Sequence, residues 1–198
     1  MIELILTRIE QRVPAPYLTG VAWFCNLPFV VDERVLIPRS PIGQMIDQGF
    51  APWWQGHTLD GQPQPQRIMD LCTGSGCIGI ATAYAFPYAR VDLADISEEA
   101  LCVARSNVTR HDLADQVTVY QSDLFDDLPE DARYDLIVSN PPYVPQQEYD
   151  DASYEVTDFE PATALVSGDD GLDHIRLMLL PIITDRTNWQ NHWQMKKT

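Results

Sequence analysis

A glycine-rich loop and two acidic residues are the groups in this sequence that could bind a nucleotide. The loop at 74–79 reads GSGCIG, matches the GxGxxG pattern and follows a strand-like run, Arg67–Leu71. Glycine is needed there because a Cβ atom would block the approach of a ligand to the backbone. Asp95 ends the next strand-like run, where an acid can accept hydrogen bonds from two ribose hydroxyls. Asp123 follows the third run and could accept from an adenine amino group.

Asp70 helps to choose between the cofactors that such a loop can bind. It stands at the end of the first strand-like run, ahead of the glycines, where a carboxylate would repel a pyrophosphate. The same carboxylate suits a ligand with a cationic end, such as the amino-acid portion of S-adenosylmethionine. This arrangement favours a methyltransferase over a dinucleotide-dependent dehydrogenase.

The run Asn140-Pro141-Pro142-Tyr143 resembles the strand-end motif of the amino methyltransferases, which binds a planar nitrogen substrate. An amide nitrogen is a poor nucleophile because its lone pair is delocalised into the carbonyl group. The side-chain oxygen of Asn140 and the backbone carbonyl of Pro141 can each accept one hydrogen of such an NH2 group, and so aim its lone pair at a methyl donor. The prolines stiffen the loop, and Tyr143 can pack its ring near the amide or the methyl cation. No histidine belongs to these motifs, and we predict no strong general base.

The elements that must position these groups alternate between strand and helix. Strands are predicted at 67–71, 91–95, 117–121 and 134–139. Helices are predicted at about 76–86, after the N-cap residue Ser97, and around 172–183. Near-continuous apolar strands separated by helices indicate a parallel, doubly wound, Rossmann-like α/β sheet, with ligands at the carboxyl ends of its strands.

The segment ahead of the sheet is predicted to hold three short elements. A hairpin is expected over Ala22–Val31, and a connecting helix should start after the N-cap Ser40 and stop at Gly49. The first element is a helix that ends before Pro14 and has an apolar face made by Ile2, Leu4, Ile5, Leu6 and Ile9.

From about residue 13 to residue 178 the sequence resembles the HemK/PrmB family of protein N5-glutamine methyltransferases. The matching pieces are PAPYLTG, VDERVLIPRSPIGQMI, DLCTGSGCIGIA, SDLFDDLP, NPPYV and EPATALVSGDDGLD. The release-factor branch of that family usually has an acid and a threonine after the Pro-Arg pair, whereas this chain has Ser40-Pro41. The variant resembles the branch that methylates the third protein of the large ribosomal subunit.

The resemblance implies S-adenosylmethionine as cofactor, a basic ribosomal protein as substrate, and Arg39 near the site. The residues expected to act on the glutamine amide are Asn140, Pro141, Pro142 and Tyr143. The residues expected to bind the cofactor are Asp70, Cys72, Thr73, Gly74, Gly76, Asp95, Ile96, Asp123, Leu124 and Asn140. No metal site is expected, because the four cysteines show no paired spacing with each other or with histidine.

The chain departs from the family pattern at both ends. Residues 1–50 are interpreted as the remnant of an N-terminal helical domain plus the hairpin and connecting helix, and 51–66 as a linker loop. Residues 67–184 are interpreted as an incomplete methyltransferase domain without its C-terminal strands, and 185–198 as a polar tail. In this interpretation the strand around 136–138 becomes an exposed apolar edge, which predicts weakened stability and reduced activity.

Composition narrows the alternatives. The net charge of −16 opposes a direct nucleic-acid site and so a nucleic-acid adenine methyltransferase, and it is compatible with a basic protein partner. No apolar run is long enough to cross a membrane, no signal peptide is evident, and the unpaired cysteines fit a cytoplasmic protein. An inactive fragment is a second alternative. An NAD dehydrogenase is a third, and it leaves the Asn-Pro-Pro-Tyr motif without a role.

Overall fold

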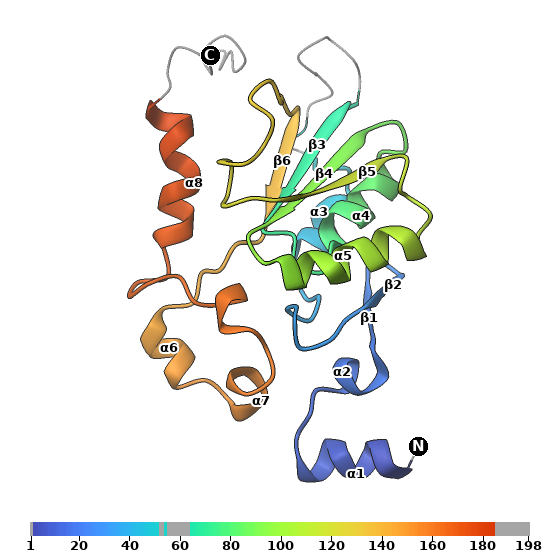
Figure 1. Cartoon of the computed structure of the whole chain (residues 1–198), viewed down its shortest axis with the longest axis vertical. Coiled ribbons are helices and arrows are strands. Elements are labelled where there is room, and N and C mark those ends of the chain that lie inside the picture. The colour runs from blue at the N-terminus through green and yellow to red at the C-terminus, as the bar shows by residue number, and fades with distance from the viewer. Residues whose placement is uncertain (1, 52–53, 55–63, 185–198) are drawn as a thin grey trace.

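The centre of the molecule is a four-stranded parallel sheet (Figure 1). In this computed structural model the described residues are 2–51, 54 and 64–184. The strand order is β5-β4-β3-β6, so the chain moves outward from β3 to β5 and then returns to place β6 on the other side of β3. This reversal creates a switch point at the carboxyl ends of β3 and β6, as in doubly wound α/β proteins. The strands are β3 (Arg67–Leu71), β4 (Arg90–Asp95), β5 (Val117–Gln121) and β6 (Leu136–Ser139).

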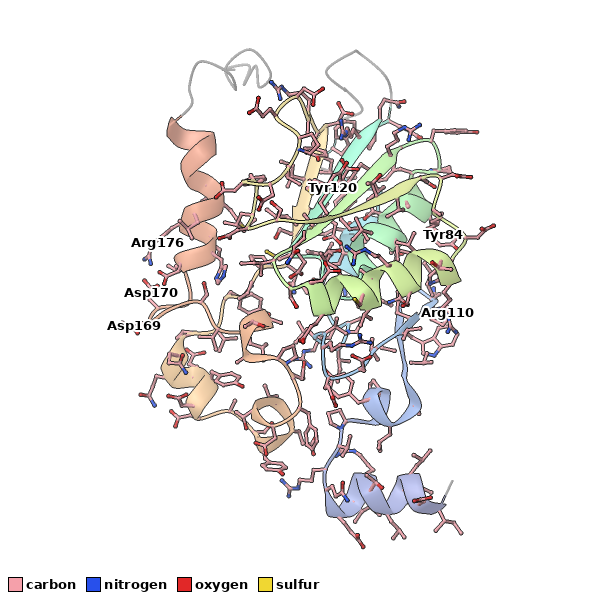
Figure 2. All side chains as sticks on the ribbon, in the orientation of Figure 1. Tyr84, Arg110, Tyr120, Asp169, Asp170 and Arg176 are labelled. Carbon is pink, nitrogen blue, oxygen red and sulfur yellow. The ribbon has the colours of Figure 1, made fainter. Side chains whose placement is uncertain are left out.

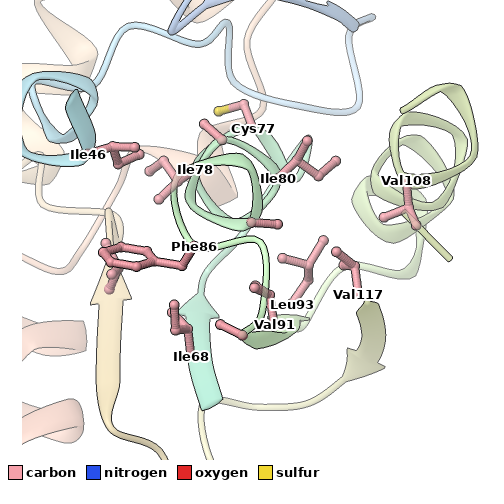
Figure 3. Packing of buried hydrophobic residues seen from close by; sticks show 14 of the residues in the cluster. Ile46, Ile68, Cys77, Ile78, Ile80, Phe86, Val91, Leu93, Val108 and Val117 are labelled. Atoms are coloured by element: carbon pink, nitrogen blue, oxygen red, sulfur yellow. The ribbon is translucent and has the colours of Figure 1, made fainter. Parts of the chain in front are cut away.

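One face of the sheet is covered by helices and holds the largest core cluster. Strand side chains alternate between faces, and Ile68, Leu93 and Val117 point toward α4 (Cys77–Ala85) and α5 (Glu98–Arg110). Figure 3 shows these residues around Ile80 of α4. The short helix α3 (Ile42–Asp47) extends this cluster through Ile46, which is buried. The cluster fixes α4, and therefore the loop that precedes α4, against the sheet.

The opposite face of the sheet is covered by loops and by α8 (Asp173–Thr184), which lies beside β6 in Figure 1. Met69 and Leu71 of β3 and Ala94 of β4 are buried there. The side chains packed against them come from the start of the loop after β3, from β5 and β6, from the loop after β5 and from α8: Cys72, Tyr120, Leu124, Phe125, Leu128, Tyr134, Ile137 and Met178. The described part of the chain therefore has two apolar layers about one sheet, and the predicted α/β fold is confirmed.

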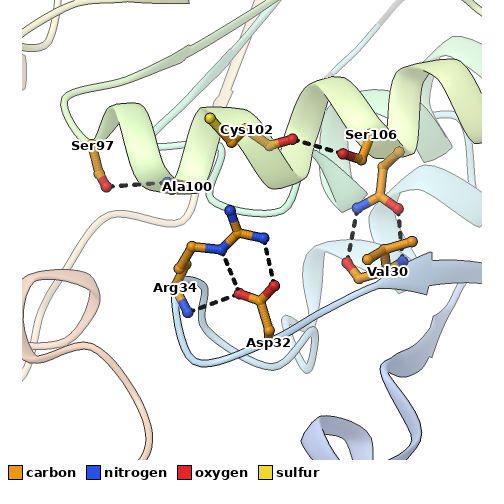
Figure 4. Close-up of polar contacts among 8 residues, drawn as sticks. Val30, Asp32, Arg34, Ser97, Ala100, Cys102 and Ser106 are labelled. Carbon is orange, nitrogen blue, oxygen red and sulfur yellow. Dashed lines mark hydrogen bonds and ion pairs between the residues drawn. The ribbon is translucent and has the colours of Figure 1, made fainter.

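The hairpin formed by β1 (Val21–Phe24) and β2 (Leu27–Val30) is anchored to the main sheet by α5. Its turn residues Cys25 and Asn26 both have positive φ, the geometry of the tight turns that suit strand twist. Asn107 of α5 is fully buried and bonds to both backbone groups of Val30, its Oδ1 accepting the N–H at 2.7 Å and its Nδ2 donating to the carbonyl at 3.0 Å. Figure 4 shows Val30 beside this helix. Asn107 Nδ2 also donates to the carbonyl of Ser75 at 2.8 Å, so one side chain links the hairpin to the glycine loop.

Two helices precede the hairpin, α1 (Ile2–Glu10) and α2 (Ala15–Thr19). The apolar residues predicted to form one face of α1 are exposed, Ile2 at 77% and Ile9 at 68%, so the described residues do not cover this face. Arg8 of α1 pairs with Glu155 of α7 (Tyr154–Thr157) at 3.0 Å. No helix among the described residues is long and apolar enough to span a membrane.

Several boundaries differ from the sequence predictions for local reasons. β6 begins at Leu136, two residues later than predicted. The two residues before it contact the sheet through their side chains: the Tyr134 hydroxyl donates to Asp92 of β4, and the Asp135 carboxylate accepts from the N–H of Arg67. α3 begins at Ile42 with Pro41 in the N-cap position and without a side-chain cap, so the prediction of Ser40 as the N-cap is wrong: Pro41 already has helical backbone angles, which moves the cap one residue along. The Ser40 hydroxyl still accepts from the N–H of Ile42 at 3.3 Å. The sequence predictions also missed three short elements between β6 and α8: α6 (Gln146–Asp150), α7 and η1 (Ala162–Ala164).

The strand expected to form an apolar edge does lie at one end of the sheet. Within the described residues β6 pairs with β3 alone, so its outer backbone groups face no further strand of that sheet. Its side chains are covered more than expected, since Val138 is buried and Leu136 and Ile137 are half-buried. Most of the predicted linker, 52–53 and 55–63, and the predicted tail, 185–198, lie outside the described residues.

Candidate active site

The candidate site lies at the carboxyl edge of the sheet, at the switch point between β3 and β6. A cavity of about 130 Å³ opens there between the glycine loop, the ends of β4 and β6, and two segments from outside the sheet, 34–40 and 161–164. Eight predicted cofactor residues line it: Cys72, Thr73, Gly74, Asp95, Ile96, Asp123, Leu124 and Asn140. Asp70 and Gly76, predicted with them, do not line it.

Gly74 and Gly76 serve different purposes in the loop. Gly74 has φ +54°, and apart from its two chain neighbours no atom of the described residues lies within 4 Å of the position where a Cβ atom would stand. The space in front of Gly74 is therefore open to a ligand. Gly76 has φ +80° at the start of α4, and a Cβ there would lie 3.2 Å from the side chain of Leu93. Gly76 thus permits close packing of α4 on β4 and does not face the ligand space.

Asp70 lies behind the loop. Because residues alternate along β3, its side chain shares the α4 face with Ile68 and is fully buried. Its Oδ2 accepts from the hydroxyl of Thr73 at 2.6 Å and from the N–H of Gly79 at 2.8 Å, while Oδ1 has no hydrogen-bond partner in the described residues. Burial raises the pKa of Asp70 to about 7, against the two hydrogen bonds that lower it. The carboxylate that was expected to face the ligand thus points toward α4 and holds the loop through Thr73 and Gly79.

Asp95 closes the loop from the side of β4. Its Oδ2 accepts from the N–H of Gly74 at 2.8 Å, and its Oδ1 accepts from the N–H of Ser97 at 3.0 Å. Each carboxylate oxygen keeps further acceptor capacity toward the cavity that it lines. Burial raises the pKa of Asp95, and the backbone hydrogen bonds oppose this shift. Asp95 therefore fixes the loop and also offers acceptor sites for hydroxyl groups.

An apolar pair and an acid stand further along the same edge. Ile96 is 60% exposed although it is a large apolar residue, and it lines the cavity together with Leu124. Leu124 has φ +50°, in a turn where Ser122 donates its hydroxyl to the Leu124 carbonyl at 2.9 Å. Asp123 is exposed and lines the cavity beside them. This end of the cavity suits a flat ring with an amino group.

Cys72 occupies a strained position in the cavity wall. Its φ is +59°, which is uncommon for a residue with a side chain. Burial, followed by the charge of Asp95, raises the pKa of Cys72 to about 12, so the thiol is neutral at physiological pH. No group of three or more potential metal ligands occurs in the parts of the chain that the structure describes.

The Asn-Pro-Pro-Tyr segment lies between the main cavity and a second, smaller one of about 50 Å³. Asn140 lines both cavities, Pro142 is buried and lines the main one, and Pro141 lines neither. Tyr143 lines the small cavity with a 58% exposed side chain, and its N–H donates to the carbonyl of Leu165. The residues shared by both cavities are Leu36, Arg39, Ser40, Asn140 and Ala164.

The main residues that sequence reasoning missed come from three segments outside the motifs. The first is 34–38 with Ser40, the second is 161–164, and the third is His174 at the start of α8, which lines the main cavity. The backbone N–H of His174 donates to Ser167 Oγ at 3.0 Å, and the same oxygen lies 2.8 Å from its Nδ1. These segments carry no local pattern of their own, although 34–40 and 161–164 fall within the pieces that resemble the glutamine methyltransferases, 31–46 and 160–173. Arg39, expected near the site, lines both cavities.

Comparison with known proteins agrees with the class that this fold and site define, a methyltransferase. The chain belongs to the family described as methyltransferase small domain, which matches residues 56–163. Among solved structures, the hMettl16 catalytic domain in complex with MAT2A 3′UTR hairpin 1 has a TM-score of 0.56 at 15% identity. That match covers 93% of this chain and 61% of the other. At that identity the likeness concerns the fold alone.

Two curated relatives are similar over most of the chain. The ribosomal protein uL3 glutamine methyltransferase of Francisella tularensis is 45% identical over 180 residues, which are 91% of this chain and 55% of that protein. The protein of the same name from Bordetella pertussis is 46% identical over 179 residues, 90% of this chain and 58% of that protein. The chain thus spans little more than half the length of these relatives. The resemblance predicted from the sequence motifs is confirmed.

Proposed function

We propose that this chain transfers a methyl group from S-adenosylmethionine to the side-chain amide nitrogen, N5, of a glutamine in protein uL3 of the large ribosomal subunit. The observation that carries the proposal is that Asn140 lines two cavities, one with the features of an adenosyl site and one small and beside Tyr143. The names of the two curated relatives support the reaction and the substrate.

The residues of the main cavity fit the proposed cofactor. The open space at Gly74 admits a ligand against the backbone, Asp95 offers acceptors for ribose hydroxyls, and Asp123 with Ile96 and Leu124 suits an adenine ring. Asp70 does not line the cavity, and its part is to hold the glycine loop through its bonds to Thr73 and Gly79. S-adenosylmethionine, when bound, supplies a methyl group made electrophilic by the sulfonium charge.

The residues of the small cavity fit a primary amide. The Asn140 side-chain oxygen accepts one amide hydrogen from the small cavity that Asn140 lines, which directs the nitrogen lone pair toward the main cavity. The Pro141 carbonyl is the second acceptor that the Asn-Pro-Pro-Tyr motif implies, although Pro141 lines neither cavity. Tyr143 lies along the small cavity and contributes an aromatic face. Ala164 lines both cavities, so the segment around it helps to exclude water between them.

The charge of the lobe that follows the Asn-Pro-Pro-Tyr segment supports a basic protein as substrate. Residues 146–173 contain no lysine or arginine and carry the acids Glu148, Asp150, Asp151, Glu155, Asp158, Glu160, Asp169, Asp170 and Asp173. Some of these pair with arginines elsewhere: Figure 2 shows Asp170 near Arg176, to which it is bonded at 2.6 Å. The structure gives no ion pair within its described residues to Glu148, Asp150, Asp151, Asp158 or Asp169. A basic substrate is attracted to such a surface, whereas a nucleic acid is repelled.

We further propose a cytoplasmic location, because the four cysteines are unpaired and the proposed substrate is a ribosomal protein. We also retain the division into an N-terminal part (1–50), a linker (51–66), a methyltransferase part (67–184) and a tail (185–198).

The proposal is tested in two stages with the same purified chain. Thermal unfolding is followed with and without S-adenosylhomocysteine, a ligand that raises the midpoint if it binds the folded state. We expect a rise that grows with ligand concentration and is lost in Asp95→Ala. Transfer of labelled methyl to the large-subunit protein, to RNA and to DNA is then measured, and we expect label in the protein alone.

Tyr143→Ala tests the role of the small cavity independently of the main one, because Tyr143 lines the small cavity and not the main one. We expect this variant to keep the thermal shift and to lose most of the transfer. Label in RNA or DNA would favour the nucleic-acid alternative. A shift with NAD and none with S-adenosylhomocysteine would favour the dehydrogenase, and a folded chain without any shift would be an inactive fragment.

A further inference from the structure

The contact between Ser40 and Asn140 joins the segment ahead of the sheet to the motif at the end of β6. Ser40 Oγ lies 3.3 Å from Asn140 Oδ1, and these residues are a hundred positions apart in the chain. Both line the main cavity and the small cavity. This side-chain contact therefore lies where the two cavities meet.

An asparagine in this position has two possible orientations of its amide group. With Oδ1 toward the substrate it accepts a hydrogen from the glutamine NH2; with Nδ2 there, two donors oppose each other. A half-turn about the last side-chain bond exchanges oxygen and nitrogen, so the two orientations have the same shape and differ only in their hydrogen bonds. Another group must make one orientation more stable.

The hydroxyl of Ser40 is arranged to act as that group. The N–H of Ile42 donates to Ser40 Oγ at 3.3 Å, so a lone pair of the oxygen is already engaged. The hydroxyl donates its one hydrogen to Asn140 Oδ1, and this donor would lose that acceptor if Nδ2 took its place. Oδ1 has two lone pairs, and a bond from Ser40 on one leaves the other for the substrate.

We propose that Ser40 is a positioning residue that orients the Asn140 amide, so that its oxygen and not its nitrogen meets the substrate amide. The inference rests on the proposed amide methylation. Each of the two hydrogen bonds is 3.3 Å long, which is longer than the usual range, so each makes a small contribution. The expected effect of losing the hydroxyl is a roughly tenfold lower kcat, as expected for a group that acts by orientation.

Kinetic measurements on five variants test the proposal. Ser40→Ala is expected to lower kcat with KM for the protein substrate changed less than about twofold, and Ser40→Thr, which keeps a hydroxyl, to retain most of kcat. In an Asn140→Ala background, Ser40→Ala should cause little further loss, because its effect passes through Asn140. Ser106→Ala removes an exposed hydroxyl that bonds to the Cys102 carbonyl on α5, and it serves as the control for hydroxyl deletion.

Nuclear magnetic resonance of the side-chain amide of Asn140 provides a readout that does not depend on activity. The pair of Asn140 NH2 signals, assigned by their loss in Asn140→Asp, should report one ordered orientation in the wild type and in Ser40→Thr. In Ser40→Ala the same signals should show exchange between orientations.

Three results would overturn the inference. The first is that the Asn140 NH2 signals are unchanged in Ser40→Ala. The second is that Ser40→Ala changes KM and leaves kcat unchanged, and the third is that Ser40→Ala lowers kcat by the same factor in the wild type and in the Asn140→Ala background. If the wild type transfers no methyl while the Asn140 signals respond to Ser40 as described, the proposed function fails and the positioning contact stands.

Discussion

Arg39 Nη1 lies 2.7 Å from Glu160 Oε1, and this ion pair joins the segment ahead of the sheet to the segment that follows α7. The Glu160 side chain is 3% exposed, whereas that of Arg39 is 49% exposed. Glu160 Oε2 has no hydrogen-bond partner within the described residues. The carboxylate is thus buried, with Arg39 as the cation that the structure pairs with it. Both residues belong to segments that line the cavities or lie next to them.

Removal of Arg39 is expected to leave a buried carboxylate without its cation. Arg39→Ala should lower the free energy of unfolding by about 2–4 kcal/mol, since an unpaired buried charge costs more than a lost surface contact. The double variant Arg39→Ala/Glu160→Gln should recover at least half of this loss, because the amide carries no charge. Urea unfolding at neutral pH measures both.

A matched control is the exposed pair of Arg105 and Glu98, whose side chains are 44% and 50% exposed. Arg105→Ala should change the free energy of unfolding by less than about 1 kcal/mol. Equal losses for Arg39→Ala and Arg105→Ala would contradict the importance of burial at Glu160.

The buried carboxyl of Asp70 is expected to make stability depend on pH. Its pKa is about 7 in the folded chain, against an ordinary value of 3.8, because burial disfavours the charged form and the charge of Asp95 adds to this. Between these two values the folded chain holds a proton that the unfolded chain has released. The free energy of unfolding should therefore fall as pH rises from about 4 to about 7, by roughly 2–4 kcal/mol from this group.

Asp70→Asn removes the titration and keeps an oxygen that can accept from Thr73 and Gly79. Urea unfolding of wild type and variant across this pH range should show a decline in the wild type that is smaller in the variant. Parallel curves would mean that Asp70 is ionised throughout and that its burial is compensated in another way.

Alanine substitutions at Gly74 and Gly79 should affect different properties: the first should abolish cofactor binding, and the second should destabilise the fold. Gly74→Ala places a Cβ in open space at φ +54°, so it should cost only about 1 kcal/mol of stability and abolish the thermal shift with S-adenosylhomocysteine. Gly79→Ala places a Cβ against the Leu93 side chain and 3.0 Å from Asp70 Cβ, so it should destabilise the fold by several kcal/mol. A folded Gly74→Ala that keeps the full shift would show that the cofactor does not approach the loop there.

The four cysteines should react with iodoacetamide in an order set by burial. Cys102 is exposed and should react first, and Cys25 should react slowly because its pKa is raised by partial burial. Cys72 and Cys77, whose pKa values burial raises to about 12, should stay unmodified at about pH 7.5. Peptide mass spectrometry locates the modified residues, with labelling in denaturant as the control in which all four react. Early modification of Cys72 in the folded chain would show that its thiol is accessible, and so contradict its burial beside the glycine loop.

The sheet and the position of the site were predictable because strong local patterns encode them. β3 and β5 lie exactly at the predicted residues, β4 begins one residue earlier, and Ser97 caps α5 by accepting from the N–H of Ala100. These features depend on side chains within a few residues of one another, which a sequence displays directly.

The burial of Asp70 under α4 was not predicted from the sequence. The cavity-lining residues that lie far from the motifs in the sequence were not predicted either. Asp70 was assigned to the ligand from its place at the strand end, although the alternation of β3 puts it on the same face as Ile68, under α4. The segment 34–38 reaches the cavity through the packing of Val35 against Ala100 and Val103 of α5, and His174 is held there by its bonds to Ser167. Such contacts leave no local periodicity in the sequence.

The cavity extends beyond the part of the chain that the family match defines, with a consequence for recombination among relatives. The match begins at residue 56, yet Leu36, Arg39 and Ser40 line both cavities and approach Asn140 and Glu160 from outside it. In a chimera that exchanged only the matched region, the cavity residues before position 56 and those after it would come from two different parent proteins. A functional chimera would therefore need the hairpin and the segment after it to come from the same parent protein as the sheet.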